Sequence, residues 1–354
     1  MHPGELVIGG FPGTSLPDTF ARALRERRRG GAILFKPNVE GGPTQVAALG
    51  RALHAASPEM PPIVGIDQEG GRVARLKAPL LEVPPMRTVA SWGDLAFAER
   101  IARAMGTELA ALGITVDFAP VLDVNTRPEN PVIGDRAFGS DAGTCARFGV
   151  AWVRGLQSTG LLACGKHFPG HGDTSKDSHV DLPVVDQPRE RLERLELVPF
   201  RAAAAEGVAM MMTAHVVYTA LDPKRPATLS PVASTTLRNE VGFGGVLVSD
   251  DLEMRAIAAR WETGEAAVAS ITAGCDALLV CWSDDKQEQA VDALEREAAR
   301  SPAFRARCEQ AWGRVMEARR KMKATPLDDE GIARLLGGTE SQSIAAEMAR
   351  RMAS

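Results

Sequence analysis

The sequence has no long apolar run. No stretch of its 354 residues approaches the ~20 consecutive apolar residues that a membrane-spanning helix needs. Its first residues, MHPGELVIGGFPG, have neither the cationic start nor the apolar core of a secretory signal. We therefore expect a cytoplasmic protein with no membrane partner.

A large excess of charge is also missing. The formal net charge is −4, and the one basic run, Arg25 to Arg29, ends a predicted helix, where cations interact favourably with the helix dipole. No nucleic-acid partner is expected from such a balance.

Cysteines are few and domain linkers are absent. The five cysteines are odd in number, scattered and mostly within apolar segments, which is typical of small buried side chains and not of a disulfide framework or zinc cluster. No Ser/Gly-rich segment separates two halves, so we expect a single domain over residues 1–354, with extra helices from about residue 303. The oligomeric state is left open, and a monomer is the starting assumption.

Short apolar runs rich in Val, Ile and Leu alternate with helical stretches along the whole chain, as in repeated βα units around a parallel sheet. The predicted strands are Leu6–Phe11, Gly31–Phe35, Ile63–Asp67, Thr115–Val121, Leu162–His167, Ala209–Val216, Val246–Asp250 and Ala277–Cys281. The predicted helices are Thr19–Arg29, Thr44–Ala56, Leu95–Leu112, Ala142–Ser158, Arg189–Glu206, Pro231–Val241, Gly264–Thr272, Lys286–Arg300, Ala303–Lys323 and Ser341–Met352. About eight strands predict an α/β fold, a single (β/α)8 TIM-type barrel with appended C-terminal helices.

Polar residues interrupt the apolar runs at the carboxyl ends of the predicted strands. In a parallel barrel these ends converge on one face, which holds the active site, so residues distant in sequence are expected to share one pocket. A single Asp at such a position is as readily explained as a helix N-cap as by catalysis, but the occurrence of the whole set favours a functional site. Its members are Asp67, Asp123, Asn125, Lys166, His167, His215 and Asp250.

The segment from Lys166 to Pro183, KHFPGHGDTSKDSHVDLP, holds three of the six histidines and is broken by Pro and Gly, so it is predicted to be a functional loop. Two kinds of chemistry fit it. A divalent metal site is possible, because the segment holds several imidazoles and carboxylates that could act as ligands. Alternatively, Asp177 and His179 form a dyad in which the carboxylate orients the imidazole as a general acid/base. The possible metal ligands are His167, His171, Asp173, Asp177 and His179.

A second motif, GIDQEGGRVAR at residues 65–75, places Asp67 beside a double glycine that permits a close approach of backbone and ligand, or simply a tight turn. No phosphate-binding glycine fingerprint occurs here or in VIGGFPG near the N-terminus, which disfavours nucleotide binding.

GIDQEGGR, KHFPGHGDTSKDSH and VLVSDDLEM occur together in this order. With GGAILF, VPPM, NPVIGDRAFG and MTAHVVY they closely resemble the glycoside hydrolase family 3 β-N-acetylglucosaminidases of the NagZ type, over nearly the whole chain. The resemblance implies a single (β/α)8 barrel and a retaining exo-β-N-acetylglucosaminidase that acts on a carbohydrate, such as a cell-wall muropeptide in peptidoglycan recycling. It implies no cofactor and no metal.

Residue roles follow by motif. The resemblance makes Asp250 the nucleophile and Asp177 with His179 the acid/base dyad. Sugar-binding positions fall on Asp67, Arg75, Arg136, Lys166 and His167. Asp251 is expected to be a helix cap or neighbour. We add His215 to the substrate-binding candidates, although a buried structural role fits it equally well.

Several alternatives remain open. A histidine acid/base should tolerate phosphate as acceptor, so the same family allows an N-acetyl-β-glucosaminide phosphorylase, and it also allows a β-glucosidase. Outside the family, a metal-dependent hydrolase would use the histidine-rich loop, and a sugar-binding barrel without activity should have lost Asp250 or His179, which are both present. The sequence leaves open the aglycone and the conformation of residues 168–182.

Overall fold

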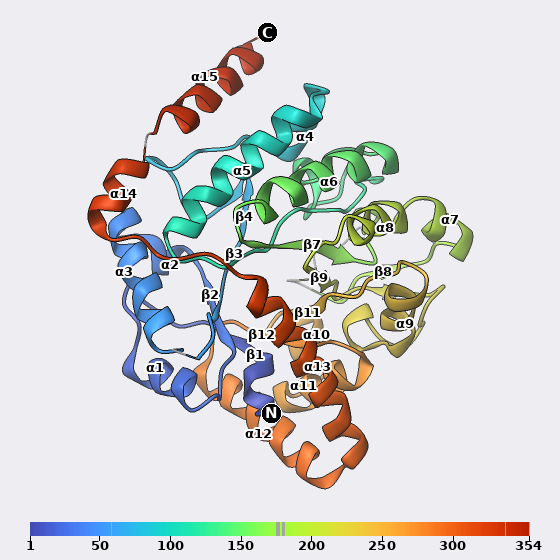
Figure 1. The fold of residues 1–354 in the computed structure, drawn as a ribbon. Coiled ribbons are helices and arrows are strands. Elements are labelled where there is room, and N and C mark those ends of the chain that lie inside the picture. The colour runs from blue at the N-terminus through green and yellow to red at the C-terminus, as the bar shows by residue number, and fades with distance from the viewer. Residues whose placement is uncertain (58, 175–177, 179–180, 337, 354) are drawn as a thin grey trace.

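The centre of the molecule is a closed barrel of eight parallel strands, as predicted. The computed structural model describes residues 1–354 except 58, 175–177, 179–180, 337 and 354. Each strand pairs with its sequence neighbours in the barrel, and the last closes on the first (Figure 1). The barrel strands are β1 (Val7–Gly9), β2 (Gly31–Leu34), β3 (Ile63–Ile66), β6 (Val116–Asp117), β7 (Leu162–Phe168), β9 (Met210–Thr213), β11 (Val246–Asp251) and β12 (Ala277–Val280).

Helices follow each strand and surround the barrel (Figure 1). Asp94, Asp141 and Ser283 begin three of them by accepting a backbone N–H of the first turn. The helices are α1 (Asp18–Arg25), α2 (Lys36–Val39), α3 (Gly42–Ala55), α4 (Met86–Ser91), α5 (Leu95–Ala111), α6 (Ala142–Gln157), α7 (Arg189–Arg194), α8 (Leu197–Ala205), α9 (Pro231–Asn239), α10 (Arg255–Ala258), α11 (Thr263–Ala273) and α12 (Asp284–Arg300).

Two predicted elements differ from the structure because of proline. The helix expected over Arg189–Glu206 is two helices, α7 and α8, since Pro199 has no N–H to bond to the carbonyl of Leu195 and its ring would clash there. The strand expected over Thr115–Val121 is shortened to β6, because Pro120 cannot donate to the ladder.

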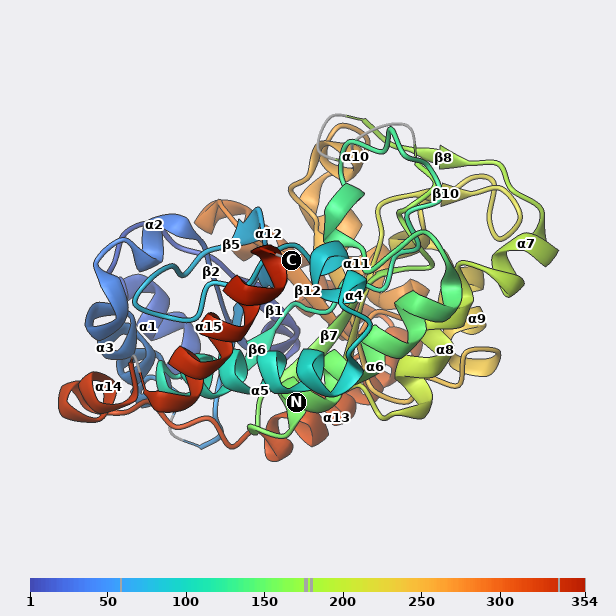
Figure 2. The ribbon, with the colours of Figure 1, turned by 90° about the horizontal axis from the view of Figure 1, so that it is seen from above.

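Short elements decorate the carboxyl end of the barrel. β4 (Gln68–Gly70) and β5 (Val73–Ala74) form a hairpin directly after β3. β8 (Val184–Val185) and β10 (Val217–Tyr218) pair in parallel, and Figure 2 shows them with α10 at the opposite end from α13 (Pro302–Lys321). Of these elements, β4, β5 and the first residue of α10 line the cavity at the strand ends.

The appended C-terminal helices pack on the amino end of the barrel and on its helical layer, and α13 also contacts β11. α13 lies against α12 and the first turn of the chain, α14 (Asp329–Leu335) lies on α3, and α15 (Thr339–Ala353) lies on α5 (Figures 1 and 2). Among the described residues, no helix combines the length and the apolar character needed to cross a membrane.

Candidate active site

A cavity of about 480 Å³ lies at the carboxyl ends of the barrel strands. Residues that follow or end β2, β3, β7, β11 and β12 line it together with the β4–β5 hairpin, so side chains from distant strand ends do share one cavity. Of the expected strand-end set, Asp123, Asn125 and His215 are not among the described residues that line it. Of the predicted substrate-binding and catalytic residues that the structure describes, those on its wall are Asp67, Arg75, Arg136, Lys166, His167 and Asp250.

The floor of the cavity is a network of ion pairs centred on Lys166. Its Nζ lies 2.7 Å from Asp67 Oδ1 and 2.6 Å from Glu69 Oε1. Arg136 binds both oxygens of Glu69, each at 2.8 Å, and Arg75 lies 3.0 Å from Asp67 Oδ2. Three cations thus share two carboxylates, which leaves donors directed at the cavity for a ligand rich in hydroxyl groups.

Charge in this network is stabilised in spite of burial. Burial alone would raise the pKa of Asp67, but Lys166 and Arg75 outweigh it and hold that pKa below its usual value. Arg136 and Lys166 lower the pKa of Glu69 in the same way, against a strong effect of burial. By contrast, burial raises the pKa of Asp117, on the neighbouring strand, well above the usual value.

Asp250 occupies the end of β11 and is half-buried at the cavity wall. Its Oδ1 accepts the backbone N–H of Asp251 at 2.8 Å. Asp251 is buried and accepts the N–H groups of Glu253 and Cys281, at 3.0 and 3.2 Å. It is therefore a loop-organising neighbour of Asp250, and not the cap of α10, which begins after Met254.

Asp123 orients the beginning of the central loop. Its Oδ2 lies 2.7 Å from His167 Nδ1, and its Oδ1 accepts the backbone N–H of His171 at 2.6 Å. A carboxylate accepts only, so Nδ1 of His167 carries the proton and Nε2 is the nitrogen left for other partners. Glycine is needed at position 172, next to His171, because a side chain there would meet the carbonyl oxygen of Val124 at 1.9 Å.

His171, one of the possible metal ligands, bonds to other residues of the loop. Its ring nitrogens bond to Thr174 Oγ1 at 2.8 Å and Ser178 Oγ at 3.1 Å. Burial lowers its pKa to about 4, so the ring is neutral at pH 7. Asp177 and His179, the expected dyad on either side of Ser178, lie outside the described residues.

His215 is not among the described residues that line the cavity, which corrects its expected place in the sugar site. It is fully buried, with Nδ1 2.7 Å from Thr228 Oγ1 and Nε2 2.9 Å from the carbonyl oxygen of Asp251. A strand-end position fixes the height of a side chain in the barrel but not the direction in which it points. This histidine supports the β11 loop from behind.

The sequence interpretation missed two features of the cavity. Glu69 binds both Lys166 and Arg136, and its position two residues after Asp67 in GIDQEGGR is a signal that could have identified it. Phe35 and Trp282 also line the cavity, and their rings stack with centroids 4.4 Å apart. No local motif marks the latter pair.

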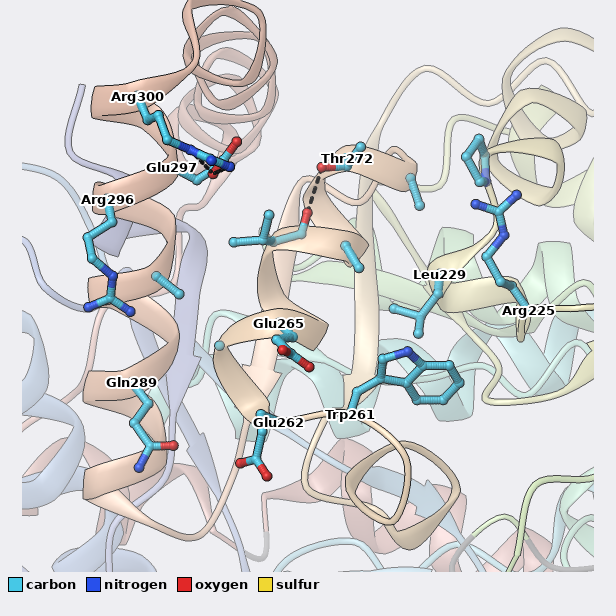
Figure 3. Close-up of a pocket in the computed structure, with 16 residues that line it drawn as sticks. Arg225, Leu229, Trp261, Glu262, Glu265, Thr272, Gln289, Arg296, Glu297 and Arg300 are labelled. Carbon is cyan, nitrogen blue, oxygen red and sulfur yellow. Dashed lines mark hydrogen bonds and ion pairs between the residues drawn. The ribbon is translucent and has the colours of Figure 1, made fainter.

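A larger hollow, of about 840 Å³, lies between α11 and α12 on the outside of the helical layer (Figure 3). The arginines and glutamates that line it come from α11, α12 and the loops next to them, and some pair locally, such as Arg300 with Glu297 at 2.7 Å. None of its residues ends a barrel strand. The chemistry is therefore to be sought in the smaller cavity.

A metal centre finds no support in the part of the chain that the structure describes. No group of three His, Cys, Asp or Glu side chains there is arranged to hold an ion. His167 and His171, two of the possible ligands, each use a ring nitrogen on a protein partner.

Comparisons with known proteins agree with the fold. The model of the glycosyl hydrolase family 3 N terminal domain matches residues 10–318. A β-hexosaminidase of Thiobacillus denitrificans is 40% identical over 302 residues, which cover 83% of each chain. A family 3 β-N-acetylglucosaminidase from Paenibacillus sp. str. FPU-7 superposes with a TM-score of 0.92 at 40% identity, covering 99% of this chain and 68% of the other.

A second solved structure matches nearly end to end. NagZ from Neisseria gonorrhoeae, in complex with N-trifluoroacetyl-D-glucosamine, has a TM-score of 0.81 and 31% identity, covering 98% of this chain and 97% of that one. A ligand that is itself an N-acylated glucosamine thus binds a relative of the same fold. The family match, the curated relatives and the barrel lead to one conclusion: the chain belongs to glycosyl hydrolase family 3 and is a glycoside hydrolase related to the β-hexosaminidases.

Proposed function

We propose that the chain is a retaining exo-β-N-acetylglucosaminidase that removes terminal N-acetylglucosamine from β-linked substrates, among them cytoplasmic cell-wall fragments in peptidoglycan recycling. The observation that supports it most is the placement of Asp250. This carboxylate stands at a strand end on the wall of a cavity whose floor is the network of Asp67, Glu69 and Lys166. A nucleophile beside a sugar-binding floor is what a retaining glycosidase requires.

In the first step a carboxylate oxygen of Asp250 forms an ester bond with the anomeric carbon, and the bond from that carbon to the aglycone oxygen breaks. His179, oriented by Asp177, gives its proton to the departing oxygen. In the second step water attacks the same carbon, His179 takes a proton from the water, and the ester bond breaks. The roles of Asp177 and His179 rest on the family resemblance.

The residues of the cavity floor bind the terminal sugar. The ammonium group of Lys166 and the guanidinium groups of Arg75 and Arg136 donate to hydroxyl groups, and Asp67 accepts from them. His167, whose Nδ1 is bound to Asp123, presents the Nε2 side of its ring to the sugar. Because these groups are already paired with one another, the site is organised before substrate arrives.

The decisive experiment traps the covalent intermediate. Incubation with a 5-fluoro-N-acetyl-β-glucosaminyl fluoride should add one glycosyl group to the intact protein, and peptide mapping should place it on Asp250. The configuration of the first-formed product, read by NMR on a natural disaccharide, should be β. No adduct together with an α-configured product would overturn the retaining mechanism.

The same preparation separates the alternatives. p-Nitrophenyl N-acetyl-β-glucosaminide should be turned over far better than the β-glucoside; the reverse preference would indicate a β-glucosidase. With added phosphate the product should remain free N-acetylglucosamine, and its replacement by the 1-phosphate would identify a phosphorylase. EDTA should leave the rate unchanged, while a loss restored by a divalent ion would favour a metal-dependent hydrolase.

A further inference from the structure

One large aromatic side chain at the cavity is left facing solvent. Trp282, which follows β12, lines the cavity and is 59% exposed. Its ring is stacked on that of Phe35, which follows β2, at 4.4 Å and an interplanar angle of 23°. The guanidinium of Arg75 lies over the same Phe35 ring, 5.8 Å from its centroid. The indole is thus supported on one face and open on the other.

The backbone that carries this ring is held in place. Glu253 Oε1 accepts the N–H groups of Trp282 and Ser283 at 2.7 and 2.9 Å, and Glu253 Oε2 lies 3.3 Å from Lys286 Nζ. Glu253 is three residues beyond Asp250, so the ring is tied to the loop that carries the proposed nucleophile. A solvent-facing indole would otherwise be mobile; here its position relative to the nucleophile is set.

Depth distinguishes two regions of the cavity. The side chains of Glu69 and Lys166, on the floor, are almost completely buried, whereas Trp282 stands at the mouth. If the terminal sugar lies on the polar floor with its anomeric carbon at Asp250, the group attached to that carbon leaves toward the mouth. A pyranose ring there has one face of C–H groups, which pairs with an aromatic face, and hydroxyl edges that stay in water.

We propose that Trp282, backed by Phe35, is the stacking wall of the aglycone subsite, and that this subsite takes a second pyranose ring. The proposal rests on the proposed function, because it assumes that the terminal sugar occupies the floor. Trp282 acts on the substrate by contact and takes no part in proton transfer or bond formation. Substrates with a ring in the aglycone are therefore preferred to those with a short chain.

The test compares two substrates that share the terminal sugar. N,N′-diacetylchitobiose has a ring in the aglycone, and 2,2,2-trifluoroethyl N-acetyl-β-glucosaminide has none. Trp282→Ala should lower kcat/KM for the disaccharide about tenfold, the size of one lost aromatic contact, and change it less than about twofold for the trifluoroethyl glycoside. Trp282→Phe should recover most of the loss, and inhibition by free N-acetylglucosamine should be unchanged in both variants.

Trp261→Ala is the matched control. This tryptophan lines the outer hollow of Figure 3, so its loss should leave both substrates unaffected. Equal losses for the two substrates in Trp282→Ala would overturn the proposal, since they would show that the ring supports the loop and not the aglycone. Failure of the proposed function looks different: the wild type would then cleave neither substrate, and free N-acetylglucosamine would not bind.

Discussion

At the scale of single residues, the proposed mechanism depends most on Asp250. Asp250→Ala should lower kcat by about four powers of ten or more, the scale seen when a covalent nucleophile is lost. The fold should survive, because this half-buried side chain bonds only to the N–H of Asp251 among its described contacts. Initial rates measure the loss of kcat in Asp250→Ala relative to the wild type, and a thermal melt of the same sample checks that the fold is retained.

Asp251→Asn is the control for that variant, since the amide oxygen can still accept the N–H groups of Glu253 and Cys281. It should keep most of the activity. If instead Asp250→Ala stayed active and Asp251→Asn did not, the nucleophile would have to be reassigned to Asp251.

His179 carries a prediction that depends on the leaving group. His179→Ala should slow a disaccharide much more than an activated aryl glycoside, because a phenolate of low pKa departs without protonation. With the aryl substrate a burst of phenol should precede a slow steady state, and azide should restore turnover to a β-configured azide adduct. Equal losses for the two substrates without a burst would move the proton-transfer role to another residue, with His171 or Asp173 the next to test.

At the scale of elements, the β11 loop should make stability depend on pH. Burial raises the pKa of Asp251 to about 7, with Asp250 and Glu253 adding to it, from 3.8 for a free side chain. Between these values the unfolded chain ionises at this position and the folded chain does not, so the stability that the protonated carboxyl contributes is present below about pH 4 and lost as pH rises to 7.

Denaturant unfolding of the wild type and Asp251→Asn across pH 4 to 8 measures this. The asparagine cannot ionise, so the wild type should lose stability relative to the variant as pH rises to about 7, and the difference should then level off. The total change in the difference between the two free energies of unfolding should be no more than about 4 kcal/mol. A difference that is constant over this range would mean that the carboxyl is ionised throughout.

The elements also show why some features were predictable. Buried parallel strands appear as apolar runs such as MMMT in β9 and ALLV in β12, so the sequence was sufficient to locate all eight. The two-residue strands β5 and β10 are too short to show a periodicity. The break before α8 follows from Pro199, which a reading of apolar spacing alone does not weigh.

At the scale of the whole molecule, the appended helix α15 should contribute stability and not catalysis. Ile344 and Met348 are buried against the barrel's helical layer, and Ser341 Oγ lies 2.7 Å from Glu108 Oε1. Removal of residues 337–354 should lower the free energy of unfolding by about 3–6 kcal/mol, since each of two large apolar side chains loses about 1.5–3 kcal/mol of burial. A thermal melt shows the loss, while kcat/KM should be unchanged.

Arg351→Ala is a milder version of the truncation, since Arg351 pairs with Asp94 at 2.9 Å and lies over the Phe97 ring. It should shift the melting temperature in the same direction by a smaller amount. A truncated protein that loses activity at full stability would show that α15 communicates with the cavity.

The assembly of the candidate site follows from barrel closure, which is why distant motifs could be expected to meet. Closure does not tell which strand-end side chains face inward: Lys166 points to the cavity, and His215 is buried behind its wall. Nor does it reveal Phe35 and Trp282, which follow the second and the last strand of the barrel and meet because β2 and β12 both flank β1. Such contacts belong to the closed barrel and leave no local pattern in the sequence.

The bonds between the β11 and β12 loops set a rule for anyone who wishes to redesign this enzyme. Asp251 and Glu253, from the loop of the nucleophile, accept the N–H groups of Cys281, Trp282 and Ser283. A β12 loop grafted from another barrel would lose its acceptors and shift, and a replaced β11 loop would release the indole. The two loops therefore form one exchangeable cassette, and libraries that vary substrate preference should transplant residues 250–254 and 281–283 together.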